Sequence, residues 1–400
     1  KGVRVDIQSA HKLKQELSIQ EKQLLSEVKK ETGIECQIWA ARSIAKVFDK
    51  LNLPYSRTLK TQSPSFTKNF LQEHEHPLVK KIAKAREINK AHTTFIDTII
   101  RYEHQGRIHA DINQIRSDQG GTVTGRFSYT NPNLQQIPAR NKDLGPLIRS
   151  LFIPESGCEW GCFDYSQQEP RLVVHFAATT TGIKEDPSVK EIVENYANND
   201  IDFHKTVSDM AGINRFQAKT INLGLFYGMG KAKLQAELGL STKQEAEELF
   251  NKYHDRVPFV RDLMNETSRW ASREGEIRTL LGRGCRFDKW EPAQFGMHTP
   301  MTWEDAVKKY GENRIRRAFT YKALNKLIQG SAADMTKKSM LDLYKEGIIA
   351  HIQIHDELDL SVESKEQADK IIEIMENAVK LAVPNKVDYE SGKTWGDIYG

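Results

Sequence analysis

The sequence predicts an α+β protein whose small antiparallel sheet is assembled from segments on both sides of a helical block. Two segments have the pattern of buried or half-buried strands, 158–167 and 351–362. The chain between them, from about 185 to 282, is mostly helical in pattern. Helices therefore separate strands that we expect to pair in space.

The composition is that of a globular protein with two or three domains. The chain has 400 residues, of which 38% are hydrophobic and 28% charged. No apolar run approaches the roughly 18 residues that a membrane helix requires, so we expect no membrane partner. Four scattered cysteines indicate a reducing compartment rather than a disulfide framework. The net charge of +4 is a mild indication of a polyanionic partner.

The N-terminal part is predicted to be helical. We expect two helices over residues 9–53, with a break near Thr32-Gly33, and a loop over the Pro-containing stretch 54–66. Residues 76–103 form a helix whose first half is basic, although an ordinary solvated face is the alternative. Its cations are Lys80, Lys81, Lys84, Arg86 and Lys90.

The middle of the chain alternates between irregular and regular segments. Residues 106–115 alternate as a strand does, and 124–141, rich in Gly, Asn and Pro, is irregular. Thr242 lies three residues before Glu245, which is a capping signal for a helix that stops before Pro258. The polar, aromatic stretch 286–312 has the composition of an insertion.

The C-terminal part is predicted to contain a helix, a hairpin and a second helix, over 313–346, 351–362 and 364–381. The first helix opens with a second basic group, 313–326, which strengthens the case for a nucleic-acid surface. In the hairpin, apolar residues alternate on both sides of the break at His355-Asp356-Glu357. The hairpin therefore carries carboxylates at its turn.

A second acid, Asp164, ends the strand predicted at 158–167, just as Asp356 ends its own strand. The two lie 192 residues apart, so only tertiary structure can join them. Buried acids need compensation, and salt bridges or helix caps are the plain explanation. The alternative is a hard divalent cation, Mg²⁺ first. Two such ions can activate an attacking oxygen and stabilise a leaving pyrophosphate.

A third stretch, 215–228, supplies candidate phosphate ligands. Arg215, Lys219, Leu223 and Tyr227 follow at steps of four and share one helix face. The cations suit phosphates, and the other two suit sugar and base. An ordinary basic amphipathic helix remains the alternative.

Together these stretches resemble the motifs of the family A DNA polymerases, the bacterial DNA polymerase I and phage replicase group. D-Y-S-x-x-E-x-R occurs at 164–171, R-x3-K-x7-Y-G at 215–228 and H-D-E at 355–357. The segments 124–141, 202–204 and 325–334 also resemble family motifs, in family order. The resemblance implies a right-hand polymerase fold with an antiparallel-sheet palm, helical fingers and a helical thumb. The expected boundaries are 1–32 for an N-terminal connecting segment, 33–110 for the thumb, 111–177 and 323–400 for the palm, and 178–322 for the fingers.

The resemblance also implies template-directed addition of dNTPs to the 3′-hydroxyl of primer-template DNA. Asp164, Asp356 and the Tyr165 carbonyl would hold two Mg²⁺ ions, for which Mn²⁺ can substitute. Glu357 would be a supporting acid and Lys219 a charge stabiliser and general acid at the pyrophosphate. Nucleotide contacts are expected from Arg215, His204, Lys219, Leu223, Tyr227, Glu169 and Gln168, and DNA contacts from Arg126, Gln135, Arg140, Asn325, Gln329, His355 and Gly228.

Some features depart from the family pattern or leave alternatives open. Gln168, Pro170 and Leu223 differ from the usual residues. A single-subunit RNA polymerase and an inactive primer-template binding module are the rival interpretations, and Glu169 favours a DNA polymerase because a carboxylate there suits exclusion of a ribose 2′-hydroxyl. We expect no 3′→5′ exonuclease within this chain, with an upstream exonuclease or helicase domain in a longer protein as an open question. The expected location is the cytoplasm of a bacterium or of a phage-infected cell.

Overall fold

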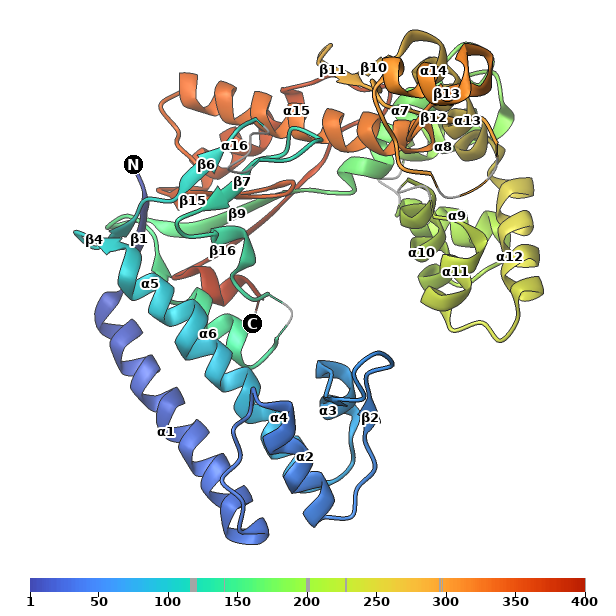
Figure 1. Ribbon diagram of the computed structural model, residues 1–400. Coiled ribbons are helices and arrows are strands. Elements are labelled where there is room, and N and C mark those ends of the chain that lie inside the picture. Colours follow the sequence, from blue (N-terminus) through green and yellow to red (C-terminus); the bar gives the residue numbers. More distant parts are fainter. Residues whose placement is uncertain are drawn as a thin grey trace.

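The centre of the fold is a four-stranded antiparallel sheet (Figure 1). The computed structural model describes residues 1–115, 121–139, 141–198, 202–226, 229–294, 296 and 298–399, and leaves the side chains of residues 210, 211, 223, 225, 226, 256 and 399 undescribed. The strands are, in spatial order, β14 (Ile352–Ile354), β15 (Glu357–Val362), β9 (Glu159–Tyr165) and β16 (Val387–Gly392). The predicted sheet, drawn from both sides of a helical block, is confirmed.

The two faces of this sheet have different chemistry, because successive side chains of a strand point to opposite sides. On one face Phe163, Tyr165, Leu358 and Leu360 are buried in a large apolar core. Helices α7 (Gln168–Thr179), α15 (Ala323–Lys345) and α16 (Lys365–Asn377) contribute to that core. The other face carries the acids, so the core holds the sheet rigid behind them.

The N-terminal region is a long helical arm (Figure 1). Gly33, with φ 74°, ends α1, which confirms the break predicted near Thr32-Gly33. Helix α1 packs along α4, and its Glu21 accepts two hydrogen bonds from Asn89 (3.0 and 3.1 Å) and contacts His92 Nε2 at 2.6 Å. The elements are β1 (Val3–Val5), α1 (Ile7–Thr32), α2 (Ala41–Lys50), β2 (Ser56–Arg57), β3 (Pro64–Ser65), α3 (Lys68–Glu73), α4 (Pro77–Lys90), the π-helix η1 (Ala91–Ile96) and α5 (Asp97–Tyr102).

Short strands and turns connect the arm to the central sheet. β1 pairs with β5 and β8 in a second antiparallel sheet, of order β4-β5-β1-β8, which is separate from the central one. The elements are β4 (Glu103–His104), β5 (Arg107–Ile108), β6 (Asp111–Asn113), β7 (Ser128–Thr130), η2 (Leu134–Gln136), α6 (Leu144–Arg149), β8 (Phe152–Ile153) and η5 (Trp395–Tyr399).

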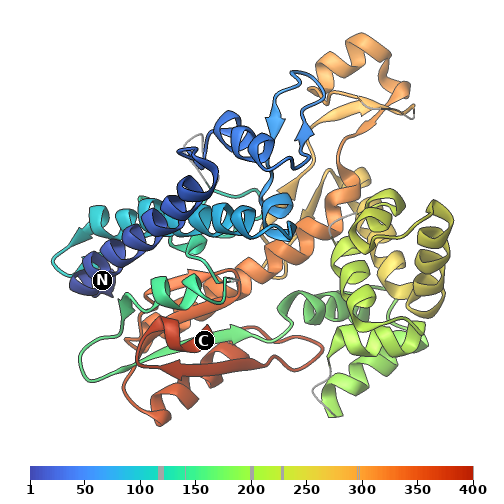
Figure 2. The ribbon, with the colours of Figure 1, turned by 90° about the horizontal axis from the view of Figure 1, so that it is seen from below.

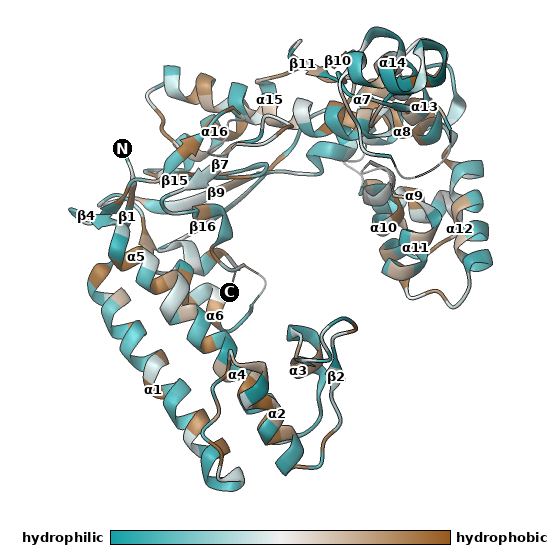
Figure 3. Cartoon of the chain, in the orientation of Figure 1, coloured by the Kyte–Doolittle hydropathy of each residue, from teal (hydrophilic) through white to brown (hydrophobic). Residues whose placement is uncertain are grey.

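A helical block lies on the other side of the sheet (Figure 1). The Thr242 hydroxyl accepts a hydrogen bond from the Glu245 N–H at 3.1 Å, and the capped helix ends at Arg256 before Pro258, both as predicted. Within the described part of the chain, no helix is both long and apolar enough to span a membrane, and Figure 3 shows hydrophilic residues along most of the outer helices. The helices are α8 (Pro187–Asn198), α9 (Phe203–Ala211), α10 (Arg215–Phe226), α11 (Lys231–Leu238), α12 (Lys243–Arg256) and α13 (Pro258–Glu274).

The helix predicted over 313–346 is wrong in its first ten residues. Phe319 has a left-handed backbone (φ 64°), which an α-helix cannot contain, and α15 begins only at Ala323. Residues 315–317 instead pair with 290–292, so the insertion expected at 286–312 continues through this strand. It projects from the rest of the chain (light orange in Figure 2). Between α13 and α15 the elements are β10 (Glu276–Arg278), β11 (Gly284–Arg286), β12 (Trp290–Pro292), α14 (Trp303–Tyr310), η3 (Glu312–Arg314), β13 (Ile315–Arg317) and η4 (Thr320–Lys322), of which β12 through β13 form the insertion.

Gly161, in the middle of β9, leaves no room for a side chain. A Cβ there would lie 2.4 Å from Val362 Cγ2 and 3.0 Å from a ring carbon of Phe163. We expect Gly161→Ala to destabilise the protein by about 1–3 kcal/mol through overpacking, seen as a lower melting temperature. Gly230→Ala is the control, because no atom lies within 4 Å of its Cβ position. Equal melting temperatures for the two variants would contradict the packing of β9 against β15.

Candidate active site

The hairpin turn and the end of β9 meet at one edge of the sheet. His355 adopts a left-handed backbone (φ 58°), which lets the chain reverse before Asp356. Glu357 then pairs directly with Asp164 across the two strands. The Tyr165 N–H donates to the Asp356 carbonyl at 3.3 Å. The two acids that the sequence singled out, 192 residues apart, are thus brought to the same edge.

The acids at this edge disfavour one another's charged forms. Burial raises the pKa of Asp164, and the charges of Asp356 and Glu357 raise it further. Burial likewise raises the pKa of Asp356. The charge of Arg126 offsets part of this effect at Asp356, and oxygen ligands of this kind suit a hard divalent cation. The residues present therefore fit Mg²⁺.

Two further acids of the same face come from β16. Asp388 pairs directly with Asp164, and Glu390 pairs with Cys162. Both raise the pKa of Asp164. They were not predicted, although the alternation of Val387 and Tyr389 with these acids is a strand signal that could have found them.

A fully buried acid, Asp359, lies behind Glu357 on the same face of β15. It is 0% exposed, and its Oδ1 accepts a hydrogen bond from Trp160 Nε1 at 3.0 Å. One ligand atom from each of Cys162, Glu357 and Asp359 lies within 4.8 Å of the others. In the sequence, Asp359 is only a polar residue in the alternating pattern of a half-buried strand. Alternation identifies the polar face of a strand but does not show whether other parts of the protein bury that face.

The cations of α10 are exposed, as expected for phosphate ligands. Arg215 and Lys219 lie one turn apart. The Arg215 guanidinium is held by Asp202, with Nε and Oδ2 2.7 Å apart. Asp202 also accepts hydrogen bonds from the backbone N–H groups of His204 (2.9 Å) and Lys205 (3.2 Å), and so caps α9. This carboxylate fixes one of the two cations relative to the neighbouring helix.

His204 is buried between α9 and α10 and is neutral at pH 7. Burial lowers its pKa to about 4, with Lys219 and Arg215 adding to the effect against Asp202. Its Nδ1 lies 3.0 Å from Asn222 Nδ2, and the Tyr253 hydroxyl donates to Asn222 Oδ1. In this arrangement Asn222 donates to Nδ1, so the ring proton is on Nε2. His204 can therefore offer a phosphate an N–H donor rather than a positive charge.

Glu169 and its neighbours lie at the start of α7. Glu169 Oε1 is 2.6 Å from a guanidinium nitrogen of Arg126, and its side chain is 12% exposed. Gln168 is buried, and its side-chain amide donates to the Thr336 hydroxyl at 3.3 Å. Its side chain is therefore directed into the protein, which does not support the predicted contact with a nucleotide. Pro170 falls in the first turn of α7, where its missing N–H is tolerated.

Arg283 ties the irregular segment 124–141 to α15. Its guanidinium donates to the carbonyls of Thr124 (2.8 Å) and Gly330 (3.0 Å) and pairs with Asp334 at 2.9 Å. This places the segment that carries Arg126 beside the helix that carries the half-buried Asn325 and Gln329. The sequence did not single out Arg283, because its partners are remote along the chain.

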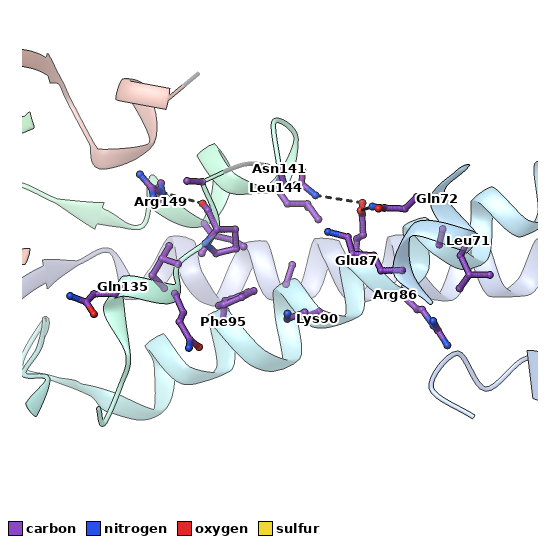
Figure 4. A pocket seen from close by; sticks show the side chains of 18 of the residues that line it. Leu71, Gln72, Arg86, Glu87, Lys90, Phe95, Gln135, Asn141, Leu144 and Arg149 are labelled. Atoms are coloured by element: carbon purple, nitrogen blue, oxygen red, sulfur yellow. Dashed lines mark hydrogen bonds between the residues drawn. The ribbon is translucent and has the colours of Figure 1, made fainter. Parts of the chain in front are cut away.

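A pocket of about 730 Å³ extends from the helical arm to the hairpin turn (Figure 4). Arg86 and Lys90 of α4 lie at it, as do Gln135 and the exposed His355. Gln135 Nε2 also donates to the Gln353 carbonyl at 3.2 Å, which fastens residue 135 to β14. Two of the five cations predicted on this helix thus border one hollow with two of the predicted DNA contacts, whereas Lys81 and Lys84 pair with the acids Glu27 and Asp143.

Four expected site residues fall wholly or partly outside the described residues. Tyr227, Gly228 and Arg140 are not described, and the side chain of Leu223 is not described although its backbone belongs to α10. Their expected contacts with template, primer and sugar stay predictions.

A four-stranded antiparallel sheet with acids at one edge and helical regions on both sides is the arrangement of a right-hand polymerase. The chain belongs to DNA polymerase family A, whose model matches residues 7–397. It is 31% identical to the DNA-directed DNA polymerase of Pseudomonas phage M6, over 100% of this chain and 64% of the relative. It is 32% identical to DNA polymerase I of Geobacillus stearothermophilus, over 99% of this chain and 44% of that protein.

A solved structure has the same fold. The POL domain of Pol1 from M. smegmatis, in complex with DNA primer-template and dNTP, matches with a TM-score of 0.76 and 26% identity, over 100% of this chain and 68% of that one. This confirms the predicted family and fold class. The chain spans a little under two thirds of the phage relative and less than half of the bacterial one.

The repulsion among the acids has a consequence for stability. The folded-state pKa of Asp164 is raised to about 8, so the folded protein keeps this proton at pH values where the unfolded chain has lost it. The free energy of unfolding therefore decreases as pH rises from the ordinary aspartate pKa toward 8. We expect Asp164→Asn to melt at a higher temperature than the wild type in EDTA, by a margin that grows from about pH 5 to about pH 8. Differential scanning fluorimetry measures this, with the exposed Asp369→Asn as control. A margin independent of pH would contradict the assigned repulsion.

Proposed function

We propose that this chain catalyses template-directed addition of dNTPs to the 3′-hydroxyl of a DNA primer, by a two-metal mechanism and without its own 3′→5′ exonuclease. Family membership supports the reaction class. The observation that carries the mechanism is that Asp164 and Asp356 come to one edge of the sheet, where burial raises the pKa of both carboxyls and the charge of Asp356 raises that of Asp164 further. Groups of this kind bind divalent cations rather than remain as buried, repelling charges.

Asp164, Asp356 and the Tyr165 carbonyl would hold two Mg²⁺ ions, or Mn²⁺ in their place. When bound, such ions supply acidity to the primer hydroxyl and positive charge to the triphosphate. Glu357 stands next to Asp164 in the adjacent strand and would orient groups around these ligands. The rigid strands limit the movement of all three carboxylates, which favours catalysis by preorganisation.

The exposed cations of α10 would bind the nucleotide's phosphates. Arg215 carries a planar guanidinium suited to paired phosphate oxygens, and Lys219 carries a proton that it can donate to the leaving pyrophosphate. His204 would add a neutral N–H donor from Nε2. Phosphate binding by α10 would require the Arg215 side chain to leave Asp202, an exposed pair that holds it only weakly.

Primer-template DNA would lie along the hollow between the arm and the sheet. Its lining includes Lys90, Gln135 and His355, which are suited to phosphate and sugar contacts that do not depend on sequence. Arg86 also lines it, but its guanidinium already donates to the Ile38 and Phe66 carbonyls. Arg126, Asn325 and Gln329 would meet the minor-groove edge of the newest base pairs. Acceptors there are similarly placed in every correct pair, so such contacts test shape rather than sequence.

Primer extension on a primed template tests the proposed function. We expect Mg²⁺-dependent extension with dNTPs, its loss in EDTA, and little extension with rNTPs. Asp356→Asn is expected to lower the rate by about 100-fold or more, since metal charge stabilisation contributes several kcal/mol, while duplex binding survives. The same labelled primer, mismatched and without dNTPs, reports any 3′→5′ shortening. Extension by Asp356→Asn near the wild-type rate would refute the metal assignment, and preferential use of rNTPs would favour the RNA polymerase alternative.

Glu169 is expected to exclude ribonucleotides by its size. Its side chain is held against Arg126, which fixes its position. Glu169→Ala should raise the rNTP/dNTP ratio of kcat/KM by about tenfold, because room for one hydroxyl is worth roughly 1–3 kcal/mol. Glu169→Gln keeps the volume and should leave the ratio nearly unchanged. If Ala and Gln give the same ratio, the carboxylate's bulk is not what excludes the 2′-hydroxyl.

A further inference from the structure

An arginine in the turn between β10 and β11 holds the backbone of the segment that carries Arg126. Arg283 Nη2 donates to the carbonyl of Thr124 at 2.8 Å and to the carbonyl of Gly330, in α15, at 3.0 Å. The Nε of the same side chain pairs with the buried Asp334 at 2.9 Å. One guanidinium therefore joins the hairpin, the irregular segment and α15.

Gly125 lets this guanidinium lie directly against the backbone of the segment. Its φ is 82°, and a Cβ there would lie 2.7 Å from Arg283 Cζ and 2.8 and 2.9 Å from the two terminal nitrogens. The planar group thus packs on the residue that precedes Arg126. A lysine would not reproduce this contact, because its ammonium is a point charge without a planar fork of donors. Arg283 therefore offers this backbone a shape as well as a charge.

The hairpin that carries Arg283 is itself fastened to α15. The Thr279 hydroxyl donates to the Asp334 carboxylate and accepts the Arg283 backbone N–H at 3.0 Å. The Leu280 N–H donates to the Ser331 hydroxyl at 2.9 Å. Because α15 is part of the apolar core behind the central sheet, the guanidinium is a fixed support for the irregular segment.

This segment reaches the candidate nucleotide site through Arg126. Its guanidinium lies 2.6 Å from Glu169 Oε1, and the two side chains are 23% and 12% exposed. A shift of the backbone just before Arg126 would lengthen this contact and so move the Glu169 carboxylate. Lys337 gives the segment a second support, with its Nζ 4.5 Å from the centre of the Phe127 ring. Loss of the Arg283 contacts should therefore shift the segment rather than unfold it.

We propose that Arg283 is a positioning residue for nucleotide selection, which fixes the backbone before Arg126 and thereby the place of the Glu169 carboxylate. This inference rests on the proposed function of Glu169 as the group that excludes a ribose 2′-hydroxyl. The plain alternative is that Arg283 only neutralises Asp334. The two roles differ for a lysine, which keeps the positive charge and loses the planar contact.

Single-nucleotide incorporation by Arg283→Lys and Arg283→Met tests this. Both variants should raise the rNTP/dNTP ratio of kcat/KM by about threefold or more, with duplex affinity within about twofold. Arg283→Lys should melt within about 2 °C of the wild type, whereas Arg283→Met, which leaves Asp334 without its cation, should melt lower. Arg278→Met is the matched control and should leave the ratio unchanged, because this guanidinium donates within the hairpin, to Glu276 and to the Gly282 carbonyl.

A Glu169→Ala background shows whether the effect passes through Glu169. There, Arg283→Lys should change the ratio by less than about twofold, because the group that it positions is gone. An equal rise of the ratio in both backgrounds would overturn the inference. A wild-type ratio in Arg283→Lys would also overturn it, and would leave neutralisation of Asp334 as the role of Arg283.

The remaining outcomes separate this inference from the function on which it rests. A loss of duplex affinity of about tenfold or more in Arg283→Lys would indicate a direct phosphate contact and overturn the positioning role. If Glu169→Ala itself leaves the rNTP/dNTP ratio unchanged, the proposed exclusion by Glu169 fails and this inference fails with it. Should Arg283→Met not fold, Arg283→Lys decides the question alone.

Discussion

The antiparallel pairing of β9 with β15 is the contact on which the rest of the molecule depends. It joins residues 159–165 to residues 357–362 and so closes the chain around the entire helical block. Without it, Asp164 and Asp356 would belong to separate parts of the chain. Because pairing across so many residues forms late and slowly, we expect the active-site edge to assemble only after the helical regions are largely folded.

This pairing opposes the electrostatics of its own edge. Five carboxylates contribute to the potential around Asp164, counting the aspartate itself, and their repulsion disfavours the closed sheet. The apolar face compensates for this, with Phe163, Leu358 and Leu360 fully or almost fully buried in the core shared with α15 and α16. Stability is thus supplied by one face of the sheet so that the other can hold mutually repelling groups, a distribution common at sites where function and stability conflict.

The sequence predicted features that depend on local pattern. A buried apolar stretch located the strand that ends near Asp164, alternation located the hairpin, and Thr242 with Glu245 located a helix start, because strand and cap signals lie within a few residues. The helix prediction failed over residues 313–322. There, residues 315–317 pair as a strand with residues 290–292, and Phe319 has a left-handed backbone. The sequence also could not show that Gln168 turns inward to Thr336 or that Asp359 meets Trp160, since each partner is more than 160 residues away.

The ion pair between Arg215 and Asp202 means that the first cation of α10 has a counterion before any nucleotide arrives. Asp202 is already committed to the N-terminus of α9 through two backbone N–H groups, so it remains in place when Arg215 leaves it. Under the proposed function, an incoming triphosphate would therefore replace one anion with another instead of neutralising an isolated cation. Electrostatically this would be an exchange of anions, in which the exposed carboxylate, holding Arg215 only weakly, would give way to a triphosphate that offers several negative charges at once.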